Sequence, residues 1–212
     1  MTNLSRFDGV TNMGLDSELL EAAELGQIGW RVYGWDGVWV SVGRFQNAER
    51  DLIDPAGTFW TLRPTGGKAV LHGHDVTVAL AVPLAALQGV DPRSIKAVYR
   101  AVVSPLVDAL LGSGVNATLA ADTVHAGRGV RSGDCFAFSS PNDIVETTTG
   151  RKLCGCALRL TQSAVLVQAS IPNGPPLVDP TTVIRNAERS EPFTWDASRF
   201  EDTFERAIRV GF

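Results

Sequence analysis

The sequence predicts an α+β fold in which a mixed or mostly antiparallel sheet packs against helices. Residues 75–82 alternate apolar with smaller or polar side chains, as strands do, while residues 94–111 and 196–210 carry apolar side chains at helical spacing. Helices combined with mostly hairpin-linked strands are typical of α+β architecture. The chain has 212 residues, 44% of them hydrophobic, which suits one sizeable core. We therefore expect a single domain over residues 1–212.

The first predicted element is a short amphipathic helix. Asp16 is a favourable N-cap, and Leu19, Leu20 and Ala23 follow it at a spacing that favours one apolar face. Gly26 stands where a glycine commonly ends a helix. The helix is therefore expected to begin after Asp16 and to end at Gly26.

Strands follow this helix. Residues 28–34 and 38–45 are rich in β-branched and aromatic side chains, and residues 35–37 between them predict a hairpin. Residues 58–63 predict another strand, which leads into a pair of glycines before the strand at 75–82. The glycine pair is therefore expected to lie between strands.

The second half begins with a helix over residues 94–111. Pro105 lies inside it and is expected to kink the helix or to divide it at Ser104, because proline lacks an N–H and clashes with the preceding turn. Gly112 and Gly114 are expected to end the helix.

The remaining segments predict a run of strands and a final helix. Residues 143–148, 151–160 and 163–172 have strand composition and are separated by turn-forming residues. Residues 196–210 place Phe200, Phe204 and Ile208 at four-residue spacing. That spacing predicts an amphipathic helix at the C-terminal end of the sequence.

Charge and composition exclude several classes of protein. The net charge of −4 disfavours a surface that neutralises many phosphates, so we expect no nucleic-acid partner. The apolar run 79–87 is too short to span a bilayer and contains a proline, so we expect no membrane partner. The N-terminal residues lack a signal-peptide pattern, and the 3 cysteines are expected to stay reduced. Together these features predict a cytoplasmic protein.

The segment RPTGGKAVLHG, residues 63–73, is the first candidate site. Gly66 and Gly67 permit backbone conformations closed to other residues, and Arg63 and Lys68 flank them. Exposed amides there would suit a phosphate or a polarised carbonyl. The spacing is not that of a Walker motif, and an ordinary basic hairpin turn is an equally good interpretation.

Cys135 is the second candidate. It follows a glycine-rich stretch that contains Arg128 and Arg131, and cationic neighbours lower the pKa of a thiol. A thiol that becomes acylated requires such a setting. Phe136 and Phe138 also fit a core strand, in which Cys135 would be a small buried hydrophobic residue.

The third candidate is the segment GRKLCGCALR. Lys152 begins a predicted strand and would point into a cleft or lie at an exposed hairpin edge. Cys154 and Cys156 are expected to share one side of the strand and to belong to the core. His72 and His74 also share a predicted face, but a zinc site needs further ligands at suitable spacing, so we expect no metal.

Several motifs, taken in order, resemble one known family. They are NMGLDSELL, RVYGW, SVGRFQ, RPTGGKAVLHGHDVTVAL, CFAFSSPNDI and GRKLCGCALR. In this order they resemble the biotin and lipoate protein ligase family, and within it the lipoate ligases and octanoyltransferases. The resemblance extends from about Asn12 to Ile171.

The resemblance implies a core like that of class II synthetases and a set of site residues. In the family the arginine and glycine motif lines an acyl pocket, and the lysine contacts the activated acyl carbonyl. In one octanoyltransferase branch the cysteine carries the acyl group. The expected catalytic residues are therefore Cys135 and Lys152, and the expected substrate-binding residues are Arg63, Thr65, Gly66, Gly67, His72, Gly155 and Ala157. An ammonium at Lys152 is expected to lower the pKa of Cys135.

The resemblance also implies a reaction. The expected activity is transfer of an octanoyl or lipoyl group from acyl carrier protein, through a Cys135 thioester, to a lysine of a lipoyl-domain protein. Such acceptors are the glycine cleavage H protein and dehydrogenase E2 subunits. This transferase requires no cofactor, and the short C-terminal part suggests that no accessory domain follows. The alternative is a ligase that uses ATP and magnesium to form an acyl-adenylate.

Five positions depart from the family pattern. Leu62, Cys156 and Leu158 stand where relatives often have arginine, serine and glutamine, and Gln168 and Ala169 where they often have histidine and glycine. The loss of an arginine and a histidine affects expected substrate contacts. A non-catalytic relative that binds a lipoyl domain or an acyl ligand is therefore a further alternative, because fold does not secure function.

Overall fold

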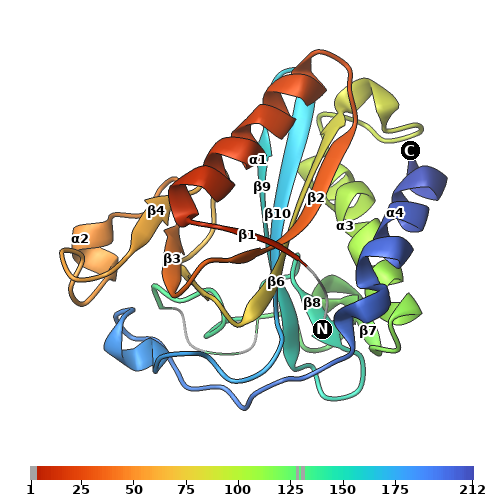
Figure 1. Cartoon of the computed structure of the whole chain (residues 1–212). Helices are drawn as coiled ribbons and strands as arrows, with labels where there is room; N and C mark the ends of the chain where they lie inside the picture. The colour runs from red at the N-terminus through yellow and green to blue at the C-terminus, as the bar shows by residue number, and fades with distance from the viewer. Residues whose placement is uncertain (1–3, 128, 130–131) are drawn as a thin grey trace.

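A seven-stranded sheet organises the computed structural model, which describes residues 4–127, 129 and 132–212 (Figure 1). Its described strands are antiparallel to their neighbours except for the first pair, which is parallel. This arrangement confirms the predicted α+β fold with a mixed, mostly antiparallel sheet. Across the sheet the strands are β1 (Ser5–Phe7), β2 (Gly29–Trp35), β6 (Asp75–Pro83), β10 (Ala164–Pro172), β9 (Lys152–Leu160), β8 (Ile144–Glu146) and β7 (Ala117–Leu119).

Helices cover both faces of this sheet. Helix α1 (Gly9–Glu24) lies on one face, and α3 (Ile95–Gly112) and α4 (Phe200–Gly211) lie on the other (Figure 1). The inner strand β6 is buried along its whole length, because both of its faces are covered. Short 3-10 helices η1 (Leu84–Ala86), η2 (Ala120–Asp122), η3 (Pro180–Thr182) and η4 (Ala197–Arg199) complete the connections.

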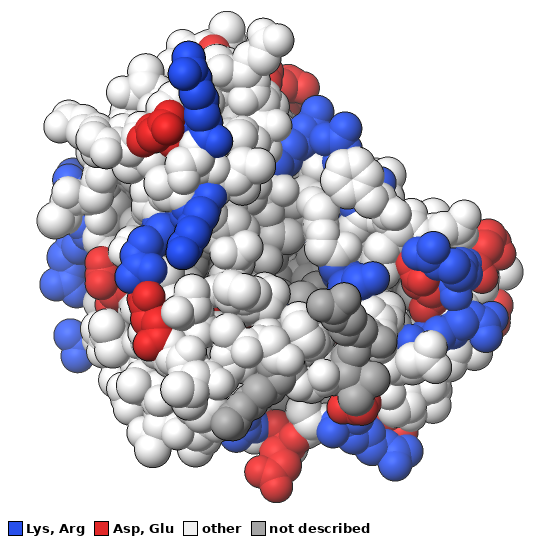
Figure 2. All heavy atoms as spheres, turned by 180° about the vertical axis from the view of Figure 1, so that it is seen from behind, with Lys and Arg blue, Asp and Glu red and all other residues white. Residues whose placement is uncertain are grey.

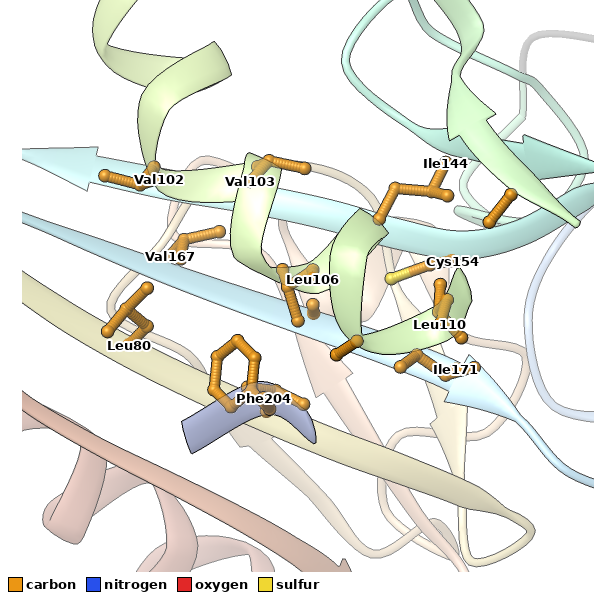
Figure 3. Close-up of a cluster of buried hydrophobic side chains, with 14 of the residues drawn as sticks. Leu80, Val102, Val103, Leu106, Leu110, Ile144, Cys154, Val167, Ile171 and Phe204 are labelled. Atoms are coloured by element: carbon orange, nitrogen blue, oxygen red, sulfur yellow. The ribbon is translucent and has the colours of Figure 1, made fainter. Parts of the chain in front are cut away.

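The larger core cluster lies between the sheet and α3 and α4. Leu106 and Leu110 of α3 point toward Val167 and Ile171 of β10, and Phe204 of α4 closes the side nearest β6 (Figure 3). All of these side chains are fully or almost fully buried. Truncation of one such leucine to alanine typically costs about 2–5 kcal/mol. The core therefore fixes the sheet on which the candidate residues stand.

A second, three-stranded sheet packs beside the first. Its order is β4 (Trp60–Leu62), β3 (Trp39–Val42) and β5 (Val70–His72), and α2 (Ala48–Asp51) follows β3 along the chain. Strand β3 is parallel to β4 and antiparallel to β5. The glycine segment therefore connects the two outer strands of this sheet, as predicted for a loop between strands, although these strands do not form a hairpin.

The first helix begins earlier than the sequence suggested. Its N-cap is Asp8, whose carboxylate accepts a hydrogen bond from the Thr11 amide at 2.8 Å. Asp16 is fully buried inside the helix and pairs with Arg31 at 2.9 Å. The prediction of an Asp16 cap was wrong, because the Asp16 carboxylate forms an ion pair with Arg31 and does not accept a hydrogen bond from a free amide at the start of the helix.

One further expectation was wrong, and one of the two alternatives for Pro105 is excluded. Strands β2 and β3 do not form a hairpin, because β1 and β6 flank β2 whereas β4 and β5 flank β3. Pro105 does not divide α3, which is continuous from Ile95 to Gly112. Tertiary packing of an apolar face contributes most of the stability of a protein helix, and it outweighs the hydrogen bond that proline removes.

The surface is mixed in charge. The face opposite to that of Figure 1 carries Lys, Arg, Asp and Glu groups around a largely uncharged centre (Figure 2). Among the described residues, no helix has the length and apolar character needed to cross a membrane.

Candidate active site

Arg63 organises the glycine loop. Its guanidinium is buried and donates to the Gly66 carbonyl from Nε at 3.0 Å and from Nη2 at 2.6 Å. Nη2 also donates to the Lys68 carbonyl at 2.6 Å, and Nη1 donates to the Ser41 carbonyl at 2.9 Å. Burial lowers the pKa of Arg63 to about 10, so the group stays charged at neutral pH. Its donors are therefore committed to the loop and to β3.

This anchoring orients the amides of the loop. A trans peptide holds its C=O and N–H on opposite sides, so the Gly66 carbonyl that faces Arg63 turns the Gly67 N–H away from it. Within the described residues, the amides of Gly67 and Lys68 have no hydrogen-bond acceptor. Two N–H groups are thus available to an oxygen of a bound molecule.

Gly67 is required by its conformation and by its neighbours. Its φ is +85°, and an added Cβ would lie 2.8 Å from Nη2 of Arg63 and 3.3 Å from Cβ of Ala157. A side chain at this position would be strained and would push against the Arg63 anchor.

A buried polar chain supports Arg63 from behind. His72 lies with Nδ1 2.7 Å from Asp75 Oδ2 and with Nε2 2.8 Å from Ser41 Oγ. The Ser41 hydroxyl, which contacts this ring, also accepts a hydrogen bond from Arg63 Nη1 at 3.2 Å. The Trp35 ring stacks on His72 with centroids 3.8 Å apart. These contacts connect the large sheet to the glycine loop.

Asp75 is the fixed end of this chain. It also accepts hydrogen bonds from Thr77 at 2.9 Å and from Ser170 at 2.6 Å. Burial raises the pKa of Asp75, but the interactions with His72 and Ser170 outweigh it and hold that pKa well below its usual value. Asp75 is therefore a buried carboxylate at neutral pH.

Cys135 lies against the glycine loop. Its amide donates to the Ala69 carbonyl at 2.9 Å, and the Ala69 amide donates to the Gly133 carbonyl at 2.8 Å. On the opposite side, a Cβ added to Gly155 of β9 would lie only 2.7 Å from Cys135 Sγ. The absence of a side chain at Gly155 therefore makes room for the thiol.

Lys152 holds a positive charge beside this thiol. Its Nζ lies 2.8 Å from Asp143 Oδ2 and donates to the carbonyls of Cys135 at 2.6 Å and Phe138 at 3.0 Å. Nζ is also 3.4 Å from Cys135 Sγ. Burial lowers the pKa of Lys152, but Cys135 and Asp143 outweigh it and hold that pKa above its usual value. Lys152 is an ammonium at neutral pH.

The pKa of Cys135 differs from the expectation. Burial raises it above its usual value, although Lys152 and Arg63 act in the opposite direction. The expected direction of the Lys152 effect is therefore confirmed, but the predicted net decrease was wrong because desolvation of the thiolate is larger. Arg128 and Arg131, also expected to lower this pKa, lie outside the described residues.

Two cavities meet at Cys135. The inner cavity has a volume of about 390 Å³ and the outer cavity one of about 880 Å³, and both volumes include space open to solvent. Gly67, Cys135 and Cys156 line both of them. The inner cavity is further lined by Met13, Tyr33, Trp35, Ser41, Arg63, Val70, His72, Thr77, Gly155, Ala157, Gln168, Ala169 and Ser170. The outer cavity is further lined by Lys68, Ser132, Asp134, Phe138, Ser140, Asp143 and Lys152.

Most of the predicted site residues come together here. The inner cavity contains Arg63, Gly67, His72, Cys135, Gly155 and Ala157, and Lys152 lines the outer one. Thr65 and Gly66 are not among the described lining residues. The Thr65 hydroxyl donates a hydrogen bond to Gln168 at 2.6 Å, and the Gly66 carbonyl accepts hydrogen bonds from Arg63. Both residues support the loop.

The other cysteine and histidine expectations have mixed outcomes. Cys154 belongs to the core, as predicted, while Cys156 is only half-buried and packs against it. His72 and His74 do not share a site, because His74 faces a groove with Phe136. Among the described residues, no group of three or more His, Cys, Asp or Glu side chains could hold a metal ion.

Four residues with contacts in or near the candidate site were not among the site residues predicted from the sequence. Asp143 lies in the quoted segment CFAFSSPNDI, but only the fold shows that it pairs with Lys152. Ser41 and Asp75 also lie in quoted motifs, and their connection through His72 depends on contacts between separate sheets. Gln168, noted as a departure, binds both Thr65 and Asp16 and thereby joins the loop to α1.

Residues 8–191 match the model of the lipoyl protein ligase A/B catalytic domain. The chain belongs to this family. Among curated relatives of this lipoyl protein ligase A/B family, it is 31% identical to octanoyltransferase LipM of Kyrpidia tusciae over 167 residues, covering 76% of this chain and 60% of that protein. It is 29% identical to octanoyltransferase LipM of Anoxybacillus flavithermus over 170 residues, with the same coverage of 76% and 60%. The chain thus spans about 60% of the length of these relatives.

Solved structures support the same lipoyl protein ligase A/B fold. A lipoate-protein ligase A bound with ATP has a TM-score of 0.66 and 22% identity, covering 100% of this chain and 84% of that one. The bi-partite lipoate protein ligase of Thermoplasma acidophilum, solved with its E2 lipoyl domain, has a TM-score of 0.61 and 20% identity, covering 100% and 83%. These similarities confirm the fold that the motifs implied.

Proposed function

We propose that this chain transfers an octanoyl group from an acyl carrier protein thioester to a lysine of a lipoyl-domain protein, through a thioester on Cys135. The observation that carries this proposal is the position of the Cys135 thiol. Its Sγ lies 3.4 Å from the Lys152 ammonium, at the place where the two cavities meet. The octanoyltransferase LipM relatives support the choice of acyl group and reaction.

In the first half-reaction Cys135 exchanges with the donor thioester. The thiolate attacks the acyl carbonyl carbon, a new C–S bond forms, and the C–S bond to the carrier breaks. The proton of Cys135 ends on the thiol of the released carrier. Because burial raises the pKa of Cys135, the Lys152 ammonium is needed beside the sulfur to stabilise the thiolate at the moment of attack.

The negative charge on the carbonyl oxygen also requires donors. The free amides of Gly67 and Lys68 are fixed before reaction, because Arg63 holds the carbonyls of this loop. Preorganised donors of this kind act strongly in a site from which water is excluded, and loss of one costs about 10²–10³ in rate. Arg63 thus acts on the reaction through the loop.

The inner cavity would hold the acyl chain. Met13, Trp35 and Val70 are among its lining residues and give it an apolar wall, as is usual for a ligand pocket. Each buried methylene contributes about 0.8 kcal/mol, so an octanoyl chain gains roughly 5 kcal/mol before ordering costs. Gln168 and Ala169, two of the departures from the family pattern, both line this cavity. We assign selectivity for the acyl tail to this region.

The outer cavity would admit the carrier arm and then the acceptor lysine. It is the larger of the two, and Lys68, Asp134 and Asp143 give it a polar wall. The related bi-partite ligase named above has its own E2 lipoyl domain, which supports a lipoyl domain as the acceptor here.

One assay tests this function against its alternatives. A lipoyl-domain acceptor is incubated with the protein and either octanoyl-acyl carrier protein or octanoate, ATP and magnesium, and the octanoylated acceptor is measured by mass spectrometry. We expect transfer from the carrier without ATP. Transfer that requires free octanoate and ATP would instead identify a ligase, as the ATP-bound structural relative allows. Tight acyl binding without any transfer would identify a non-catalytic relative.

Cys156 provides a matched control for the nucleophile. It also lines both cavities, but its strand position places it against the core. Cys135→Ser is expected to abolish transfer, whereas Cys156→Ser is expected to retain it. Transfer that survives in Cys135→Ser would contradict the thioester mechanism.

A further inference from the structure

Release of the acyl group raises a problem that Cys135 and Lys152 do not solve. An acceptor lysine has an ordinary pKa of about 10.4 and arrives as an ammonium, which cannot attack a carbonyl. Lys152 cannot remove that proton, because its Nζ already faces Asp143, two carbonyls and the Cys135 sulfur and is held as an ammonium. The outer cavity therefore needs another proton acceptor.

Two carboxylates, Asp134 and Asp143, are among the described residues that line the outer cavity. Asp143 forms the ion pair with Lys152 at 2.8 Å and accepts from the Ser140 amide at 2.6 Å. Asp134 has no ion pair with a described residue, although its Oδ1 accepts from the Phe136 amide at 3.0 Å. Asp134 is therefore the carboxylate available to an incoming cation.

The surroundings of Asp134 suit a base. It is only 5% exposed, yet it lines both the outer cavity and an adjoining groove that also contains Lys152. Burial raises the pKa of Asp134, which increases its basicity. Its electrostatic effect reaches both Cys135 and Lys152, so it lies near the thioester position.

We propose that Asp134 binds the ammonium of the acceptor lysine and takes one proton from it before the amine attacks the Cys135 thioester. This proposal rests on the proposed function. The amine nitrogen forms a C–N bond to the acyl carbon, and the C–S bond to Cys135 breaks. Of the three ammonium protons, one goes to Asp134, one goes to the departing Cys135 sulfur and one stays on the amide. Asp134 then returns its proton to solvent.

Other charged groups also face Asp134. Lys152 of β9 and the backbone N–H of Glu188 favour its ionised form, whereas the charge of the Glu188 side chain disfavours it. Arg151 and His74 line the adjoining groove, and Cys135 follows Asp134 directly. A test must therefore separate proton transfer to Asp134 from the electrostatic effect of the other charged groups in this region.

The test uses enzyme already octanoylated on Cys135, mixed in single turnover with a lipoyl domain or with hydroxylamine. Asp134→Asn keeps an oxygen for the Phe136 amide but removes the base. Hydroxylamine is neutral near pH 7 and needs no prior deprotonation. General bases contribute about 10²–10⁴-fold, so we expect Asp134→Asn to slow deacylation by the lipoyl domain at least about 100-fold. The fold-decrease in the rate of deacylation by hydroxylamine is expected to be at least about ten times smaller.

The pH dependence gives a second readout. Above the pKa of Asp134 the wild-type rate is expected to vary little with pH, whereas the Asp134→Asn rate should rise about tenfold per pH unit as the free amine becomes more abundant. Glu188→Gln, which removes an exposed carboxylate from the groove, is the control and is expected to follow the wild-type profile.

The proposal is overturned if Asp134→Asn is deacylated by the lipoyl domain at the wild-type rate. It is also overturned if the substitution slows deacylation by the lipoyl domain and by hydroxylamine equally. Absence of any octanoyl adduct on wild-type Cys135 would instead remove the proposed function, and this inference with it. The two failures are therefore distinguishable by mass spectrometry of the loaded enzyme.

Discussion

Gly155→Ala tests the packing of the reactive thiol. The added Cβ would stand 2.7 Å from Cys135 Sγ and 3.6 Å from Lys152 Cε. An ordinary nonbonded contact is about 3.5 Å or longer, so the sulfur must move by about 0.8 Å or more. A displacement of about 1 Å at a reacting atom can cost about 100-fold in rate. Overpacking of this kind also destabilises the fold by about 1–3 kcal/mol.

The assay follows octanoylation of Cys135 by mass spectrometry at a temperature well below unfolding, with stability measured separately in urea. We expect a fall in loading rate of about 100-fold, with the variant still folded. Gly133→Ala is the matched control, because its added Cβ meets its nearest atom, the Arg185 carbonyl, at 3.4 Å. If Gly155→Ala loads at the wild-type rate, the thiol position inferred here is wrong.

Three further predictions concern ionisation and buried charge. Alkylation of Cys135 by iodoacetamide should keep accelerating as pH rises past 9.0, because burial raises the pKa of this thiol above that value; a plateau near pH 7 would contradict it. Lys152→Met should cost about 3–5 kcal/mol in urea unfolding, because it leaves the buried Asp143 carboxylate without its cation. The folded pKa of Asp75 lies below the usual 3.8, so its contribution to stability is present above pH 3.8 and is lost as pH falls through the lower folded value. Urea unfolding of Asp75→Asn should accordingly depend less on pH below 3.8 than unfolding of the wild type, and equal acid sensitivity would refute this.

Much of the fold could be predicted because its main elements have regular local patterns. The alternating residues 75–82 form β6, and the helical spacing at residues 196–210 matches α4. Pairing between distant segments carries no such local signal. The sequence could not show that β2 and β3 belong to different sheets, because each is flanked by strands far along the chain.

The site was predictable where the family motifs specify a backbone feature or a reactive group. Gly67, Cys135 and Lys152 meet as the resemblance implied. The net direction of the pKa shift of Cys135 was not predictable from the sequence. Burial raises this pKa, and the depth of burial is a property of the folded chain. The support of the loop by Gln168 was also hidden, since it requires Thr65 and α1 to approach β10.

The central claim is that Cys135 carries the acyl group. The most direct measurement is peptide mass spectrometry of the protein after incubation with octanoyl-acyl carrier protein, followed by addition of a lipoyl domain. We predict an octanoyl thioester on Cys135 that disappears as the acceptor lysine becomes octanoylated. Acceptor octanoylation without any adduct on Cys135, together with unchanged transfer by Cys135→Ser, would contradict the account.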